Sequence, residues 1–91
     1  MMDLIQMSTS IRHAKAIAFD FSNLFRLSDA AVLQRFRITR KVNPDVVPRD
    51  FQPNACRIAR DLEAITLHFL QQESPEDPGT EIFRFSFQPA T

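Results

Sequence analysis

The chain has 91 residues, a formal net charge of zero at pH 7, an apolar fraction of 44% and a charged fraction of 24%; this indicates one folded domain over residues 1–91 and excludes a disordered chain. The only glycine, Gly79, and the only cysteine, Cys56, exclude the glycine-rich loops that hold phosphates, an internal disulfide and a thiolate-rich metal site. We therefore expect neither a cofactor nor a metal.

The N-terminal region shows no secretory signal and no membrane span, and the alternative is that residues 7–19 resemble an amphipathic transit segment. It has no basic stretch followed by an apolar one, and no uninterrupted apolar run exceeds four residues, the length of residues 16–19. A membrane-spanning helix needs about 20 apolar residues. We therefore expect an intracellular, cytoplasmic protein without a membrane partner.

Residues 15–21 form the first predicted element. Large apolar side chains alternate here with smaller or polar ones, at Ile17, Phe19 and Phe21. This alternation favours a strand whose large side chains face the core. The competing interpretation is a helix, because a second apolar set lies on one helical face: Ile11, Ala14, Ala18, Phe21 and Phe25. The two readings stay open for residues 10–26.

A helix is predicted over residues 29–37. Ser28 can accept a hydrogen bond from the first helical turn, and Asp29 lies where the helix dipole favours an anion. Leu27 and Val32 occupy the positions of a hydrophobic staple. The end of the helix is open, because a strand-like alternation continues through Phe36, Ile38, Arg40 and Val42.

Residues 27–42 resemble the first helix and turn of a helix-turn-helix, with small residues at Ala30 and Ala31. In that motif a second helix enters the major groove of DNA. Here Pro44 and Pro48 follow at once, and proline interrupts a helix. We therefore assign no functional residue from this resemblance.

A second helix is predicted after Pro53, with Asn54 as its cap. One apolar face supports it, made by Ile58, Leu62, Ile65 and Phe69. The alternative ends this helix near Leu62 and makes residues 64–72 a strand. The two readings of residues 64–72 stay open.

Residues 81–88 are the clearest predicted strand. Phe83, Phe85 and Phe87 point to one side, while Arg84, Ser86 and Gln88 point to the other. The Phe side chains are interpreted as core. The alternative is an edge strand that offers them to a dimer or to a partner groove.

These elements predict a small α+β domain with two main helices packed on a two- or three-stranded sheet. A sheet of this size has exposed edges, which tend to pair with another chain. We therefore expect a homodimer, with the Phe-rich surface supplying core or dimer contacts.

Charge is unevenly distributed along the chain. Residues 26–60 hold eight basic against three acidic residues, whereas residues 61–91 hold one basic against six acidic residues. The predicted binding patch is Arg35, Arg37, Arg40, Lys41 and Arg49. It has three interpretations: a solvated face paired with the chain's own acidic third, a contact for an acidic protein or second copy, or a nucleic-acid contact through residues 35–49.

The candidate catalytic groups are few and separated. His13 and His68 have no carboxylate at a telling spacing. Cys56 would lie in the first turn of the second predicted helix, and His68 would follow it on that helix after about 18 Å of axial rise, too far for a nucleophile–base pair. We therefore expect that the protein is not an enzyme. The predicted function is a protein–protein interaction module, an adaptor or inhibitor-like accessory protein, and the alternative is nucleic-acid binding.

Overall fold

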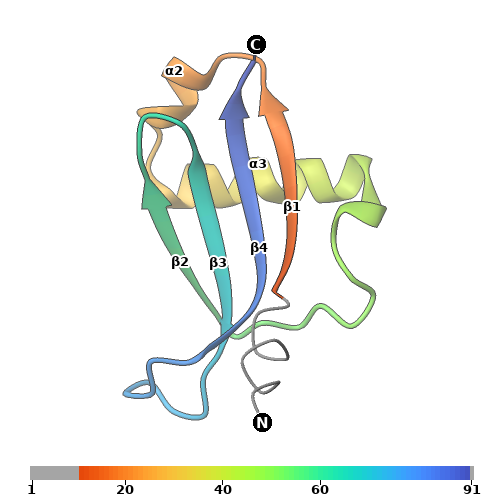
Figure 1. The fold of residues 1–91 in the computed structure, drawn as a ribbon, viewed down its shortest axis with the longest axis vertical. Coiled ribbons are helices and arrows are strands. Elements are labelled where there is room, and N and C mark those ends of the chain that lie inside the picture. Colours follow the sequence, from red (N-terminus) through yellow and green to blue (C-terminus); the bar gives the residue numbers. More distant parts are fainter. Residues whose placement is uncertain (1–10, 91) are drawn as a thin grey trace, which may run out of the picture.

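A computed structural model describes residues 11–90, which form a four-stranded mixed sheet with helices on one face (Figure 1). The elements are β1 (Arg12–Ala18), α2 (Phe21–Phe25), α3 (Asp29–Val42), the 3-10 turn η1 (Pro44–Val46), β2 (Ala55–Arg60), β3 (Ile65–Gln71) and β4 (Thr80–Pro89). The strand order is β1-β4-β3-β2. Strands β2, β3 and β4 run antiparallel in sequence, and β4 pairs in parallel with β1.

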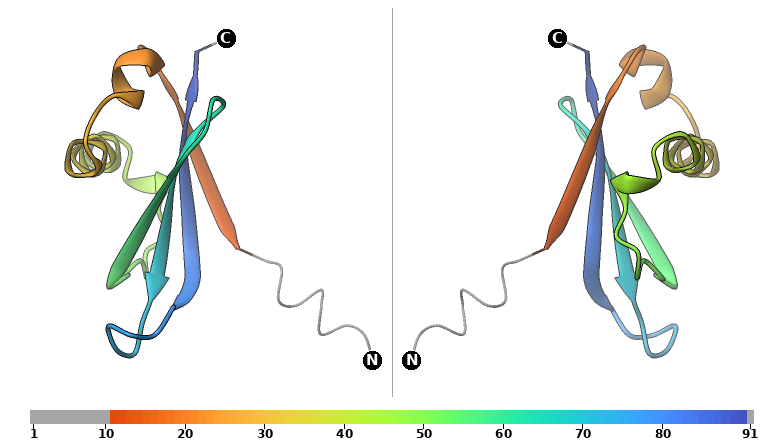
Figure 2. Two further views of the ribbon diagram at one scale, coloured as in Figure 1. Left: turned by 90° about the vertical axis from the view of Figure 1, so that its left-hand side faces the viewer. Right: turned by 90° about the vertical axis from the view of Figure 1, so that its right-hand side faces the viewer.

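The helices lie on one side of the sheet only. Figure 2 shows α2 and α3 together on one face, and no described element covers the other. The chain leaves β1 at one edge, passes through both helices, and enters β2 at the opposite edge. Helix α3 therefore crosses the sheet behind its strands (Figure 1).

The predicted architecture of two main helices on a two- or three-stranded sheet is wrong. The fold is α+β, but it has four strands, one long helix and one short helix. The error lies in the predicted second helix, whose residues form the hairpin of β2 and β3. The alternative strand reading of residues 64–72 agrees with β3.

A tight turn separates β2 from β3. The Asp61 carboxylate accepts hydrogen bonds from the backbone N–H groups of Glu63 at 2.7 Å and Ala64 at 2.9 Å. An aspartate that accepts hydrogen bonds from the backbone of the next residues in this way stabilises a turn. The alternating residues Ile65, Leu67 and Phe69 are then buried on the helix side of the sheet.

Helix α3 begins at the predicted residue and ends later than predicted. The Ser28 hydroxyl oxygen accepts a hydrogen bond from the backbone N–H of Ala31 at 3.2 Å, which confirms the N-cap. The helix continues to Val42 and stops before Pro44, because the residue that precedes a proline is disfavoured in helical conformation. The strand-like alternation after Phe36 therefore has no structural counterpart.

Strand β1 presents the opposite face from the one predicted. Its core-facing residues are the small Ala14, Ala16 and Ala18, while Ile17 points outward. The strand ends at Ala18, because Asp20 caps α2 by accepting a hydrogen bond from the backbone N–H of Asn23 at 3.3 Å. Small side chains on this strand leave room for α2 and α3 above the sheet edge.

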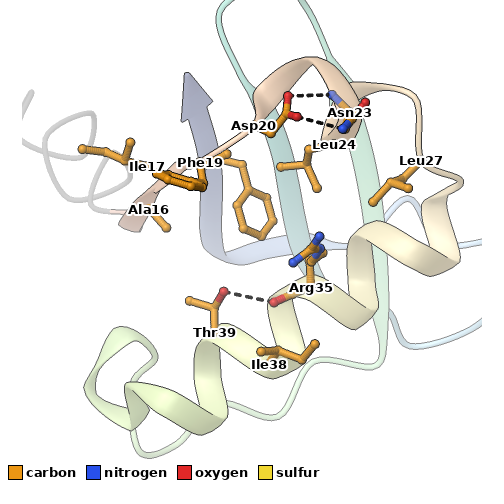
Figure 3. A pocket seen from close by; sticks show the side chains of 12 residues that line it. Ala16, Ile17, Phe19, Asp20, Asn23, Leu24, Leu27, Arg35, Ile38 and Thr39 are labelled. Carbon is orange, nitrogen blue, oxygen red and sulfur yellow. Dashed lines mark hydrogen bonds between the residues drawn. The ribbon is translucent and has the colours of Figure 1, made fainter. Parts of the chain in front are cut away.

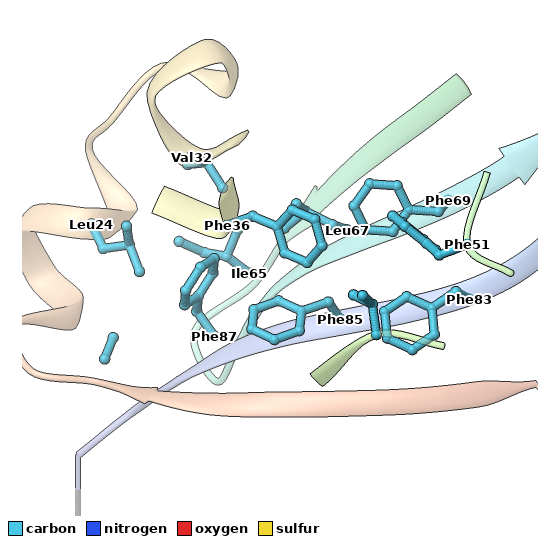
Figure 4. Close-up of a cluster of buried hydrophobic side chains, with 12 residues drawn as sticks. Leu24, Val32, Phe36, Phe51, Ile65, Leu67, Phe69, Phe83, Phe85 and Phe87 are labelled. Carbon is cyan, nitrogen blue, oxygen red and sulfur yellow. The ribbon is translucent and has the colours of Figure 1, made fainter. Parts of the chain in front are cut away.

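The core is a cluster of phenylalanine rings on the helix side of the sheet (Figure 4). Phe83, Phe85 and Phe87 are buried on β4, an interior strand paired on both sides. The ring of Phe85 lies with its centroid 5.0 Å from those of both Phe36 and Phe87. The three β4 rings are therefore core residues, and the edge-strand alternative for them does not hold.

Candidate functional site

The five basic residues predicted as one patch are divided between two hollows. Arg37, Arg40, Lys41 and Arg49 line a hollow of about 580 Å³, which we call the basic hollow. Arg35 lines a different hollow. Arg40 and Lys41 follow Arg37 by three and four positions, so the three share one side of α3. Arg35 lies two positions before Arg37 and therefore faces another side of the helix.

The segment that follows α3 supplies the rest of the basic hollow. Pro44, Asp45, Val47 and Pro48 line it beside the cationic side chains. Turn η1 brings this segment back against the end of α3. Arg49 therefore lines the same hollow as Arg40 and Lys41 of that helix. The hollow is thus concave, and its lining combines cationic side chains with apolar ones and with Asp45.

Asp45 is the acidic residue that lines the basic hollow, and it forms no ion pair with the cationic side chains there. Within residues 11–90, none of the hollow's four cationic side chains forms an ion pair. The Arg40 guanidinium instead lies over the ring of Phe51, 5.1 Å from its centroid. Arg40 and Lys41 also lie in the last turn of α3, where the helix dipole favours cations.

Two acidic residues of the C-terminal third, Asp77 and Glu81, make contacts elsewhere in the fold. Asp77 accepts hydrogen bonds from the backbone N–H groups of Glu73 and Gly79 in the loop between β3 and β4, and these bonds lower its pKa. Glu81 binds Arg84 on its own strand and His68 on the next. These two carboxylates are therefore not partners of the cationic side chains in the basic hollow.

A second hollow, of about 380 Å³, opens between the end of β1, α2 and α3 (Figure 3). We call it the apolar hollow; its apolar lining includes Ala16, Leu24, Leu27, Ile38 and Phe87. Its two charged side chains are Arg35 on α3 and Asp20 at the start of α2.

Large apolar side chains at this hollow are exposed. The exposed fractions of the Ile17, Phe19 and Ile38 side chains reach 70%, 101% and 48%. The sequence analysis placed Ile17 and Phe19 in the core, so this surface was missed. The signal that could have found it is the run of small alanines at alternate positions of β1, which marks the opposite face as the core-facing one.

The open face of the sheet carries a row of basic side chains that the sequence analysis also missed. Strand register places His13 beside Arg84, Arg84 beside His68, and His68 beside Arg57. Only the pairing of four separate strands brings these residues together. No spacing along the chain indicates the row.

Glu81 contacts two residues of this row, Arg84 and His68. Its carboxylate accepts hydrogen bonds from Arg84 Nε at 2.9 Å and Nη2 at 3.0 Å, and its Oε2 lies 2.7 Å from His68 Nδ1. These contacts, with that to Arg84 the largest, lower the pKa of Glu81 to about 2. The carboxylate is therefore charged at neutral pH and offsets part of the positive charge of the row.

His13 and Ser86 form a hydrogen-bonded pair at one side of the row. The distance from His13 Nε2 to Ser86 Oγ is 2.9 Å, and Ser86 Oγ lies 3.3 Å from the Thr66 hydroxyl. Burial, followed by the charges of Arg84 and Lys15, lowers the pKa of His13. Its imidazole is therefore neutral at pH 7, and the network links β1, β4 and β3.

Cys56 was predicted in the first turn of a helix. It lies instead half-buried in β2. Burial and the nearby Asp29 raise the pKa of its thiol to about 11, so the reactive thiolate is scarce at neutral pH. His68 pairs in register with Arg57, the neighbour of Cys56, so the thiol and the imidazole point to opposite faces of the sheet.

Two further findings concern the described part of the chain. Across residues 11–90, no three His, Cys, Asp or Glu side chains gather closely enough to hold a metal ion. No helix in that range has the length and apolarity needed to cross a membrane.

Comparison with known proteins gives no relative for this chain: no protein family, no curated protein and no solved structure matches it.

Proposed function

We propose that this protein is a non-enzymatic interaction protein, of an adaptor or inhibitor-like kind, which binds an acidic surface of a partner protein in the basic hollow. The observation that carries the proposal is the convergence of Arg37, Arg40, Lys41 and Arg49 on one concave surface without an internal ion pair among the described residues. A guanidinium fork donates paired hydrogen bonds to a carboxylate, which suits arginine to this role.

Two observations support the non-catalytic part of the proposal. The raised pKa of Cys56 disfavours a nucleophilic thiolate, and His68 lies on the opposite face of the sheet from that thiol. A single cysteine, which cannot form an internal disulfide, supports a setting in the reducing cytoplasm.

A protein partner is favoured over nucleic acid by the other residues of the hollow. Val47 and Pro48 line the same surface and add apolar contact area, which suits a protein surface better than a phosphate backbone. The chain also has no net charge, whereas a nucleic-acid-binding domain is usually basic overall. Nucleic-acid binding through residues 35–49 is the alternative.

The test compares two polyanions on the full chain. Fluorescein-labelled poly-L-glutamate and a labelled single-stranded oligonucleotide of similar charge are titrated with protein, and their fluorescence anisotropy is recorded at several salt concentrations. We expect poly-L-glutamate to bind, and the double variant Arg37→Glu with Arg40→Glu to bind it about tenfold more weakly or worse.

The matched control is the double variant Arg26→Glu with Arg57→Glu, which changes net charge equally at two exposed arginines outside the hollow. It should bind poly-L-glutamate as the unaltered chain does. Equal losses in both variants would mean that only overall charge matters, and would refute a specific site. Tighter binding of the oligonucleotide, with a steep decrease in affinity as salt rises, would replace the proposal with the alternative.

A further inference from the structure

The apolar hollow combines a cavity and a projecting side chain on one surface. Its walls are the end of β1, α2 and α3, and the Phe19 side chain stands fully exposed at its mouth (Figure 3). Ile17 on β1 and Ile38 on α3 also line the hollow and are exposed. Exposed aromatic and aliphatic side chains that cluster around a cavity mark a contact surface.

The same surface carries one acidic and one basic side chain. Asp20 lies on the α2 wall and Arg35 on the α3 wall. Neither forms an ion pair within the described residues. Asp20 keeps its carboxylate near the surface, where it caps α2 through Asn23.

A two-fold symmetric contact requires that a surface be complementary to itself. This surface meets that requirement in shape, because it has both a projecting ring and a hollow. It meets it in charge as well, because Asp20 of one copy would face Arg35 of the other, twice per contact. The zero net charge of the chain places no overall repulsion between two copies.

We propose that two copies of this chain associate through the apolar hollow, with Phe19 of each copy entering the hollow of the other and Arg35 of each copy pairing with Asp20 of the other. The contact is independent of the basic hollow and of any partner bound there. It differs from the dimer expected from the sequence, whose Phe83, Phe85 and Phe87 lie in the core.

The experiment uses analytical ultracentrifugation of the full chain over a range of concentrations up to about 1 mM. The unaltered chain should dimerise. Phe19→Ser should weaken dimerisation by about tenfold or more, because it removes the inserted ring. The control Leu62→Ser alters another highly exposed large apolar side chain, on the turn between β2 and β3, and should leave dimerisation unchanged.

Charge reversal tests the pairing itself. Arg35→Glu and Asp20→Lys, taken singly, each place like charges opposite one another and should weaken self-association by about tenfold. An equimolar mixture of the two variants restores both opposite-charge contacts, so it should form heterodimers about as well as the unaltered chain dimerises. Loss of the α2 cap in Asp20→Lys cannot explain recovery on mixing, since mixing does not repair a cap.

Three results would overturn the proposal. The first is an unaltered chain that stays monomeric throughout the concentration range, as it would if another segment of the chain filled the hollow. The second is dimerisation unaffected by Phe19→Ser, which would point to pairing at a sheet edge. The third is no association in the mixture of the two charge variants.

Discussion

Glu81 is held between Arg84 and His68 on the open face of the sheet, and its side chain is mostly shielded from water. Its pKa falls from the model-compound value of 4.5 to about 2 because the Arg84 and His68 contacts favour the charged form. A carboxyl group whose folded pKa is depressed stabilises the fold above its unfolded pKa, and this stabilisation is lost as pH falls towards the folded value.

We therefore expect the free energy of unfolding to decrease as pH falls from about 5 to about 2, with Glu81 contributing about 1–2 kcal/mol after allowance for solvent screening. Glu81→Gln should lose that contribution at pH 7 and flatten the pH profile. Urea unfolding followed by circular dichroism measures both, because the chain has no Trp or Tyr for fluorescence.

The control for this prediction is Glu76→Gln, which neutralises an exposed acid in the loop between β3 and β4. It should leave stability at pH 7 and the shape of the profile nearly unchanged. A Glu81→Gln variant with the same profile as the unaltered chain would contradict the role given to the Arg84 and His68 contacts.

At the scale of elements, the hairpin of β2 and β3 depends on the turn that Asp61 closes. Asp61→Ala removes two hydrogen bonds to backbone N–H groups and should destabilise the fold by about 1–2 kcal/mol in urea unfolding. Glu63→Ala, an acidic neighbour in the same turn, should cost less than about 0.5 kcal/mol. Equal costs would mean that the carboxylate of Asp61 does not hold the turn.

Sequence patterns within a few residues correctly predicted the start of α3 and strand β4. The start of α3 was predictable because its cap is local: the Ser28 side chain accepts a hydrogen bond from the backbone N–H of Ala31, three residues further along the chain. Strand β4 was predictable because its three Phe alternate without a competing helical pattern. Arg37, Arg40 and Lys41 were grouped because they lie close together in the sequence. Their common helical face was not predicted, because the predicted helix ended at residue 37 and α3 continues to Val42.

Long-range pairing decided the rest. Ile58, Leu62, Ile65 and Phe69 fit a helix by spacing, but β4 needs a strand beside it, and β3 pairs with it from Ile65 onward. Intrinsic strand preference depends strongly on such partners. Likewise, neither the row on the open face nor the exposure of Phe19 could be inferred without the strand register and the position of α2.

At the scale of the whole molecule, the apolar hollow and the basic hollow are both lined by one helix. Helix α3 is 14 residues long and supplies Arg35 and Ile38 to the apolar hollow, and Arg37, Arg40 and Lys41 to the basic hollow. Its remaining face, with Val32 and Phe36, is buried against the sheet. One helix thus joins the core, the proposed self-contact and the proposed partner contact.

The two contacts should be separable by variant and by salt. Arg37→Glu with Arg40→Glu should weaken poly-L-glutamate binding and leave dimerisation intact, whereas Phe19→Ser should do the reverse, because sites without shared partners behave additively. Raising salt from about 0.05 to about 0.5 M should weaken poly-L-glutamate binding strongly and dimerisation little, since salt screens exposed charges and does not weaken apolar burial. Both quantities are measurable on the same samples by anisotropy and ultracentrifugation. If Phe19→Ser also weakened poly-L-glutamate binding, the explanation would be that one long polyanion bridges the basic hollows of two associated copies. A glutamate peptide too short to span both hollows would then bind the unaltered chain and Phe19→Ser equally.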